Sequence, residues 1–166
     1  MKELILAVGN TVNGDDGIGS YIVEQVNRYI YEAVKTATIS SFGEIVTIDC
    51  GTIPENYTSV IRKQRPDRLV MVDAAELGLS PASYRIVKPE HIGVMTMSTH
   101  NMPLSLFVSY VNQFCREVLL LGIQPKRIEL NTELSPELYK AGDEVARLIV
   151  NGRLSDIKLY KPNTIT

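Results

Sequence analysis

Short apolar segments alternate along this chain with amphipathic helical segments, and this alternation limits the fold more than any other feature. The apolar segments are rich in Val, Ile and Leu and bounded by turn residues, as strands are. They cover residues 3–8, 44–50, 68–74, 83–88 and 117–124. Strands buried on both faces and separated by helices form an open, mostly parallel sheet with helices on both sides. The sequence therefore predicts an α/β fold, a three-layer α/β/α sandwich around a mostly parallel five-stranded sheet.

Four helices are expected between and after the strands, and in three of them apolar residues recur at three- and four-residue spacing. They cover about residues 18–34, 55–64, 104–114 and 138–149. The second follows Thr52-Ile53-Pro54-Glu55, which has the spacing of a capping box. The fourth follows Ser135-Pro136, a capping residue before a proline at the first helical position.

The length of 166 residues predicts one compact domain over residues 1–166, with no linker or repeat. A core of this size needs neither a disulfide nor a metal ion to fold, so a metal site would be functional.

The two cysteines, Cys50 and Cys115, lie in apolar surroundings, and we expect buried, reduced thiols. The tail, residues 152–166, has no clear periodicity and is left unassigned.

The charge pattern excludes several classes of partner. The net charge is −2, and no run of Lys and Arg occurs, which argues against nucleic acid and against an anionic membrane surface. No stretch approaches about 18 uninterrupted apolar residues, and no signal peptide opens the chain. We therefore expect a cytoplasmic protein, and nothing in the pattern indicates a stable oligomer.

The loop after the first strand has glycines but lacks the residues that bind phosphate. Gly9 and Gly14 have the spacing of a P-loop, but Asp15 and Asp16 stand where Lys and Ser or Thr are required. Two carboxylates at a helix N-terminus repel a phosphate, and the helix dipole keeps them ionised. The loop therefore favours cations, which argues against a nucleotide-binding protein. We interpret Asp15 as the helix N-cap and Asp16 as an outward-facing ligand.

A second carboxylate and a histidine are expected at the same edge of the sheet. Asp73 ends an apolar strand and His100 precedes the third helix, and both are expected on strand-to-helix loops. A helix or turn cap is the structural alternative for Asp73. The other histidine, His91, lies in a polar turn and is expected at the surface. Together Asp16, Asp73 and His100 form a set of two oxygen ligands and one nitrogen ligand that suits Ni²⁺, Zn²⁺ or Fe²⁺.

Four segments make the chain recognisable when they are taken together. They are VGN (8–10) with GDDGIG (14–19), DCGTIPEN (49–56), VDA (72–74) and STHNMPL (98–104). In this order and spacing they resemble the maturation endopeptidases of [NiFe]-hydrogenases, most closely the hydrogenase 3 (formate hydrogenlyase) type. The similarity covers about residues 3–125 and leaves out residues 31–43 and the tail.

The resemblance implies a twisted, mostly parallel sheet and an enzyme that removes a C-terminal peptide from the hydrogenase large-subunit precursor after nickel insertion. The metal-contacting positions of the family fall on Asp16, Asp73 and His100. Nickel would be carried by the substrate, and another divalent metal is an alternative in the free enzyme. Some relatives have Glu at the first position, and Asp16 has a shorter reach.

The hydrolytic chemistry stays open at this point between two routes. Asp16 or Asp73 holds the water as a general base, or the nickel ion acidifies it. A serine or cysteine nucleophile is disfavoured, because no G-x-S-x-G elbow occurs and neither cysteine has a basic partner in the pattern. The competing function is that of a non-catalytic, metal-binding assembly chaperone for the same large subunit.

Overall fold

The computed structural model describes residues 1–38, 43–93 and 102–162. Its centre is a five-stranded sheet with the strand order β2-β1-β3-β5-β4. The strands are β1 (Lys2–Ala7), β2 (Glu44–Asp49), β3 (Arg68–Ala74), β4 (Tyr84–Val87) and β5 (Glu117–Ile123). Each lies within one residue of its predicted bounds at either end, because the apolar runs that predict them are the parts buried in the sheet.

Four of the strands run in the same direction. β1 pairs in parallel with β2 and β3, and β3 pairs in parallel with β5, whereas β4 is antiparallel to β5 at one side of the sheet. The four parallel strands consequently end along one edge, which we call the carboxyl edge. In open α/β sheets, binding sites form beyond this edge.

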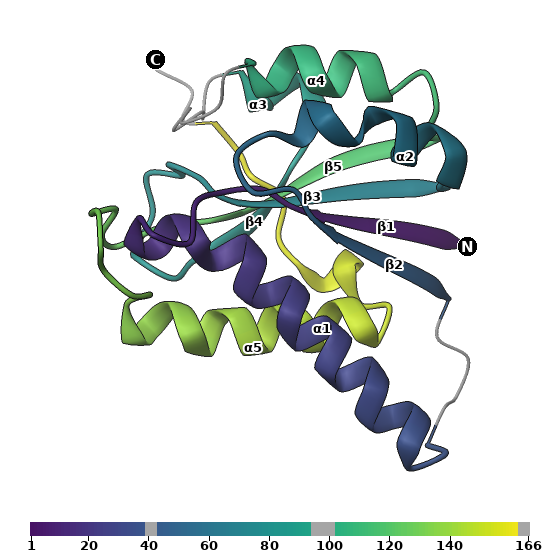
Figure 1. Ribbon diagram of the computed structural model, residues 1–166. Helices are drawn as coiled ribbons and strands as arrows, with labels where there is room; N and C mark the ends of the chain where they lie inside the picture. Colours follow the sequence, from purple (N-terminus) through teal and green to yellow (C-terminus); the bar gives the residue numbers. More distant parts are fainter. Residues whose placement is uncertain (39–42, 94–101, 163–166) are drawn as a thin grey trace.

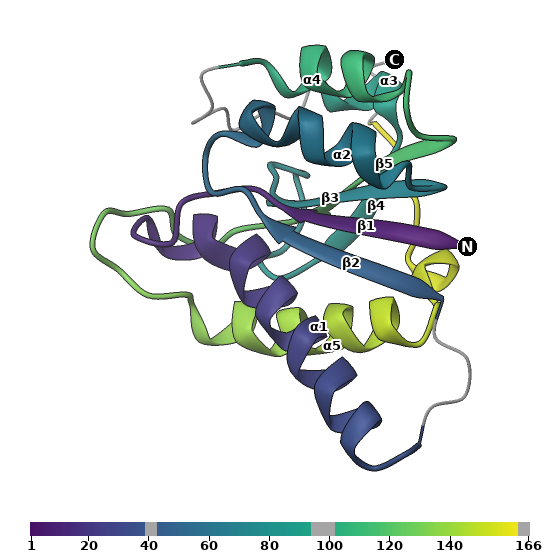
Figure 2. The same cartoon turned by 45° about the vertical axis from the view of Figure 1, so that its right-hand side comes forward.

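Helices cover both faces of the sheet, so the predicted three-layer α/β/α architecture is confirmed (Figure 1). One face carries α1 (Ile18–Lys35) and α5 (Pro136–Val150), and the other carries α2 (Thr58–Gln64), α3 (Pro89–Ile92) and α4 (Leu104–Val111). The view turned by 45° shows the same division (Figure 2).

Alternate residues of the strands supply two separate cores. In β1, Ile5 and Ala7 belong to the core beneath α1 and α5, whereas Leu4 and Leu6 belong to the core beneath α2 and α4. Because side chains alternate between the faces of a strand, a strand between two helical layers is apolar at successive positions. This explains why the strands read as continuous apolar runs.

Two predicted helix signals differ from what the structure shows. The 3-10 helix η2 (Pro54–Tyr57) begins after Ile53 without a side-chain cap, so the predicted capping box of Thr52 and Glu55 is wrong. Ser135 does stand at the N-cap of α5, but its hydroxyl makes no cap hydrogen bond. The hydroxyl donates instead to the carboxylate of Asp15, in the loop after β1.

The tail has structure that the sequence pattern did not predict. A 3-10 helix, η3 (Leu154–Asp156), is followed by an extended segment beside β4. Ile86 donates its N–H to the carbonyl of Lys158 (3.0 Å) and accepts the N–H of Tyr160 (2.8 Å). Leu154 and Ile157 are buried in the core beneath α5. Residues 158–160 thus extend the sheet beyond β4.

Cys50 and Cys115 are buried free thiols, as predicted. His91 lies in α3 and is half-buried, with its ring 6.3 Å from that of Tyr160, so the prediction of a surface turn is wrong. In the part of the chain that the structure describes, no helix is long and apolar enough to cross a membrane.

Candidate functional site

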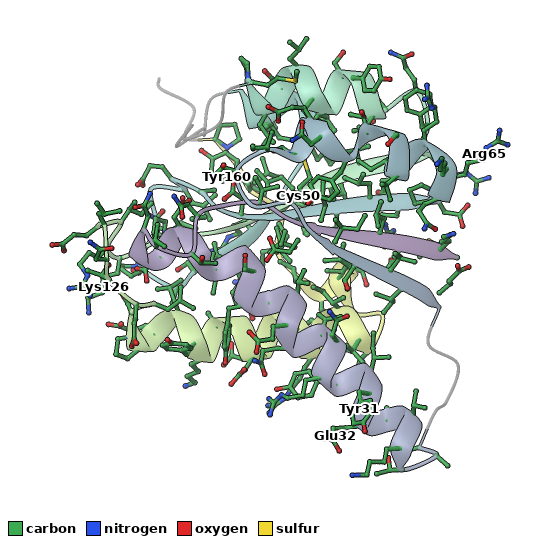
Figure 3. All side chains as sticks on the ribbon, viewed as in Figure 1. Tyr31, Glu32, Cys50, Arg65, Lys126 and Tyr160 are labelled. Carbon is green, nitrogen blue, oxygen red and sulfur yellow. The ribbon has the colours of Figure 1, made fainter. Side chains whose placement is uncertain are left out.

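Backbone hydrogen bonds join the ends of three strands at the carboxyl edge. The N–H of Val8 donates to the carbonyl of Val72 (3.0 Å), and the N–H of Gly9 donates to that of Gly51 (2.9 Å). Cys50 likewise donates to Ala7 (2.9 Å). Figure 3 places Cys50 near the middle of the molecule, Lys126 beyond the carboxyl edge and Arg65 at the opposite edge. These hydrogen bonds hold the loops that follow β1 and β2 against each other, next to the end of β3.

Asp16 lies in the first of these loops, in the 3-10 helix η1 (Gly14–Gly17). Its Oδ2 accepts the N–H of Asn10 (3.0 Å). The side chain is buried, with Asp16 only 2% exposed, so the prediction of an outward-facing residue is wrong. The reason is that the loop folds back onto its own start.

Glycines allow this close packing. Gly9 has φ +136°, and a Cβ there would lie 2.0 Å from the carbonyl oxygen of Asp16. At Gly19, in the first turn of α1, a Cβ would lie 2.5 Å from the carbonyl of Val72 and 2.9 Å from that of Val8. Only glycine lets the start of α1 rest directly on the ends of β1 and β3.

Asp73 is the penultimate residue of β3, opposite Gly122 of β5, and is 6% exposed. A loop to β4, and no helix, follows β3, so the prediction that Asp73 stands on a strand-to-helix loop or caps a helix is wrong. The backbone of the preceding residue, Val72, contacts Val8 and Gly19. The structure thus places Asp73 and the Asp16 loop at the same edge of the sheet.

The third predicted ligand, His100, lies outside the described residues. Within residues 1–38, 43–93 and 102–162, no group of three or more His, Cys, Asp and Glu residues is placed to hold a metal ion. The described part of the site is therefore a pair of buried acids, Asp16 and Asp73. Carboxylates in this position provide oxygen ligands for a cation or a general base for hydrolysis.

Asp15 has a structural task that differs from the predicted one. The N-cap of α1 is Gly17, so the interpretation of Asp15 as that cap is wrong. Its buried carboxylate accepts four hydrogen bonds from the segment between β5 and α5: the N–H groups of Lys126 (2.8 Å), Arg127 (2.8 Å) and Ser135 (2.6 Å), and the Ser135 hydroxyl (2.9 Å). Asp15 therefore ties this segment to the loop that carries Asp16.

Gln124 is a positioning residue that the sequence pattern did not reveal. Its side-chain oxygen accepts the N–H groups of Leu77 (2.7 Å) and Leu79 (3.3 Å). These residues belong to the loop that leaves β3 after Asp73. In the sequence, Gln124 only ends an apolar strand, so no local signal indicates that its amide holds a neighbouring loop.

Cys50 is a thiol beside the site without the properties of a nucleophile. Burial, followed by the charges of Asp49 and Glu55, raises the pKa of Cys50 to about 12. The thiolate is the reactive form of cysteine, and here it is disfavoured near neutral pH. This arrangement agrees with a site that works through its carboxylates.

Comparison with known proteins identifies the family. The sequence model described as "Hydrogenase maturation protease" (HycI) matches residues 21–152. This chain belongs to the hydrogenase maturation protease family. It is 40% identical over 126 residues to the hydrogenase 3 maturation protease of Escherichia coli, a match that covers 75% of this chain and 74% of the relative.

Two further matches in the family cover a larger share of the chain. A putative hydrogenase maturation protease of Methanocaldococcus jannaschii is 30% identical over 161 residues, 96% of this chain and 92% of the relative. The solution structure of the endopeptidase HycI from Escherichia coli superimposes with a TM-score of 0.83, at 31% identity and 99% coverage of both chains. The chain is accordingly an endopeptidase of the hydrogenase maturation protease family, as its motifs predicted.

Proposed function

We propose that this protease removes the C-terminal extension of a [NiFe]-hydrogenase large-subunit precursor after nickel insertion, and that it recognises the nickel which the precursor carries. The supporting observation is the position of Asp16 and Asp73, two buried acids on separate segments that meet at the carboxyl edge. In this proposal Asp16, Asp73 and His100 take open positions on the substrate's nickel ion and so hold the precursor in place.

The proposed reaction adds water across one peptide bond. The oxygen of water bonds to the carbonyl carbon, the C–N bond breaks, and the leaving nitrogen gains a proton. Either Asp16 or Asp73 takes the proton from the water, or the nickel ion lowers the pKa of that water. Precursor loaded with other divalent metals separates the two routes, because a rate that follows the acidity of the metal-bound water assigns the activation to the metal.

The test mixes the purified protein with nickel-loaded and nickel-free precursor and measures the mass of each product. We expect the loaded precursor alone to lose a peptide, and the variants Asp16→Asn, Asp73→Asn and His100→Ala to leave its mass unchanged while they stay folded. Asp67→Asn is the control, because Asp67 lies at the opposite edge of the sheet and contacts Lys2. Cleavage of nickel-free precursor at the same rate would contradict nickel recognition.

The competing function is that of a non-catalytic chaperone, which would bind the precursor and leave its mass unchanged.

In our proposal the chain acts in the cytoplasm as a monomer that forms a short-lived complex with its substrate. A second divalent metal in the free enzyme is the alternative to substrate-borne nickel, and metal analysis of the purified protein before and after mixing separates the two.

A further inference from the structure

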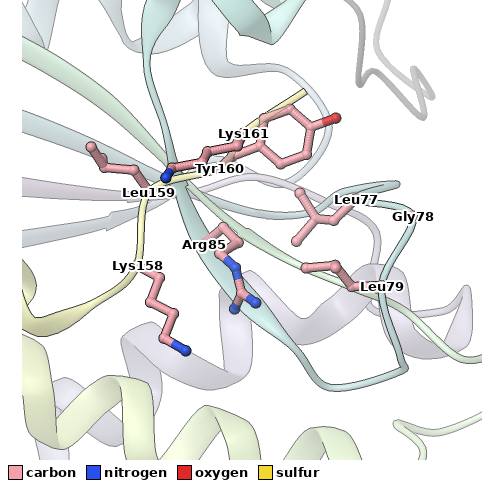
Figure 4. A pocket seen from close by; sticks show the side chains of 8 residues that line it. All are labelled: Leu77, Gly78, Leu79, Arg85, Lys158, Leu159, Tyr160 and Lys161. Carbon is pink, nitrogen blue, oxygen red and sulfur yellow. The ribbon is translucent and has the colours of Figure 1, made fainter. Parts of the chain in front are cut away.

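A cationic pocket lies between the tail and the loop that follows β3, next to β4. Its volume is about 570 Å³, and its walls come from the loop after β3, from β4 and from the tail. The lining residues are Leu77, Gly78, Leu79, Arg85, Lys158, Leu159, Tyr160 and Lys161. Figure 4 shows Arg85 and Lys158 extending in the same direction, with Leu77 and Leu79 across from Arg85.

The charges of this pocket are not neutralised within the described protein. In residues 1–38, 43–93 and 102–162, neither Arg85 nor Lys158 nor Lys161 forms an ion pair. The carboxylate of the nearby Glu76 accepts hydrogen bonds from the N–H of Gly78 and from the Gln124 side-chain amide, and it forms no ion pair with the described cations of the pocket. Three uncompensated cations on a chain of net charge −2 form a local positive patch that complements a negatively charged ligand.

The tail also provides an unpaired strand edge at the same place. Ile86 bonds to the residues on either side of Leu159, so the N–H and C=O of Leu159 point away from β4. No described residue bonds to these two groups, and Leu159 is 49% exposed. An exposed edge of this kind pairs with an extended peptide, which gains backbone hydrogen bonds there.

One wall of the pocket comes from the loop that follows the proposed active site in the chain. Residues 77–79 belong to the loop that begins directly after Asp73 and β3, and Gln124 holds this loop against the end of β5. A substrate that occupies the carboxyl edge therefore has its neighbouring segments within reach of the pocket.

We infer that this pocket, together with the Leu159 edge, binds an acidic, extended segment of the precursor as an added strand. The backbone of the segment pairs with Leu159, and its carboxylates lie near Arg85, Lys158 and Lys161. This inference rests on the proposed function for the identity of the occupant and goes beyond it by assigning a second docking site on this chain.

The first test measures peptide binding by fluorescence anisotropy, using a labelled peptide of alternating Glu and Val and a matched peptide of alternating Lys and Val. We expect the wild-type protein to bind the Glu peptide more tightly and the affinity to fall as salt rises. The double variant Lys158→Glu/Lys161→Glu weakens this binding by about tenfold. The control, Lys35→Glu/Lys140→Glu, makes the same change in charge on exposed lysines of α1 and α5 and leaves the affinity unchanged.

A backbone variant tests the strand pairing separately from the charge. Leu159→Pro removes the outward N–H and keeps both hydrogen bonds to Ile86, which use the carbonyl of residue 158 and the N–H of residue 160. We expect weaker binding of the Glu peptide at an unchanged unfolding temperature. Equal affinity of the two lysine double variants, or equal affinity of wild type for both peptides, would overturn the inference.

The second test measures KM and kcat for nickel-loaded precursor. The variant Lys158→Glu/Lys161→Glu is expected to raise KM by about tenfold with kcat unchanged, whereas the control variant changes neither. Absence of cleavage by the wild type would contradict the proposed function, and the peptide experiment would still decide whether the pocket binds an acidic strand. If the pocket variant binds the Glu peptide weakly but shows the KM of the control, the precursor is not the occupant and the inference is wrong.

Discussion

At the scale of single residues, two adjacent aspartates have different tasks. The carboxylate of Asp15 accepts four hydrogen bonds from a distant segment, whereas that of Asp16 accepts the N–H of Asn10 within its own loop and lies at the edge that holds Asp73. Both are almost fully buried, so burial alone does not separate the structural acid from the candidate catalytic acid. The hydrogen-bond partners make that distinction.

Gly9→Ala is expected to lower the free energy of unfolding by about 3 kcal/mol or more, since the residue has a positive φ and its Cβ would overlap the carbonyl oxygen of Asp16. Urea unfolding measures this loss. Gly152→Ala is the matched control, because Gly152 has φ +66° but no atom within 4 Å of a Cβ, and its cost should be about 1 kcal/mol. Equal losses in the two variants would show that strain in φ, without the overlap, explains both.

Cys50→Ala is expected to keep its cleavage activity, because the thiol, whose pKa is raised to about 12 by burial, is not ionised near neutral pH. The measurement is the initial rate of precursor cleavage, and Cys115→Ala serves as the control for the loss of a buried thiol. A folded Cys50→Ala protein without activity would assign this residue to the chemistry.

At the scale of elements, the segment between β5 and α5 is held to the Asp16 loop by both backbone and side chain. Asp15 donates its own N–H to the carbonyl of Arg127 (2.9 Å), and Gly14 donates to Thr132 (3.1 Å). The N–H of Asn131 donates to the carbonyl of Val12 (2.7 Å). The site loop therefore depends on an element that is more than a hundred residues away in sequence.

Asp15→Ala is expected to destabilise the protein by about 3 kcal/mol, because the buried N–H of Ser135 and the partly buried N–H groups of Lys126 and Arg127 lose their acceptor. The comparison is Asp16→Asn, which keeps the size of the side chain and one oxygen that can accept the N–H of Asn10, and should cost about 1 kcal/mol. Thermal or urea unfolding measures both variants. A stability loss at position 16 as large as that at position 15 would contradict the division of tasks between the two aspartates.

At the scale of the whole molecule, three groups in or against the two cores lose their protons at higher pH in the folded chain than in the unfolded chain. Burial raises the pKa of Cys50 to about 12 and that of Cys115 to about 11 from an ordinary value of 9.0. Burial, with a hydrogen bond to Asp143, raises the pKa of Tyr21 to about 12 from 10.0. The unfolded chain loses these protons at lower pH than the folded one does.

Stability is therefore expected to fall as pH rises above about 9. A group whose pKa is raised on folding contributes its full stability below its unfolded pKa and loses it as pH rises through the folded value, here from 9.0 to about 12. The measurement is the unfolding temperature between pH 7 and pH 11. The double variant Cys50→Ala/Cys115→Ala should have a shallower decline above pH 9, and an unchanged decline would remove the thiols as its cause.

The sequence by itself determined the strands, the three layers and the family, because these depend on local properties. Buried strands need continuous apolar residues, and amphipathic helices need a periodic face, whatever the neighbouring elements are. The motifs around Asp16 and Asp73 are also contiguous in the chain and could be recognised one by one.

Only the tertiary structure decided which loop each polar side chain hydrogen-bonds to. Asp15, Gln124 and Ser135 hydrogen-bond to segments distant in sequence, and such pairings leave no periodic pattern in the chain. The same holds for the tail, since residues 158–160 pair with β4 through backbone groups that every residue possesses. Long-range hydrogen bonds depend on the positions of both partners, and the folded chain alone brings those partners together.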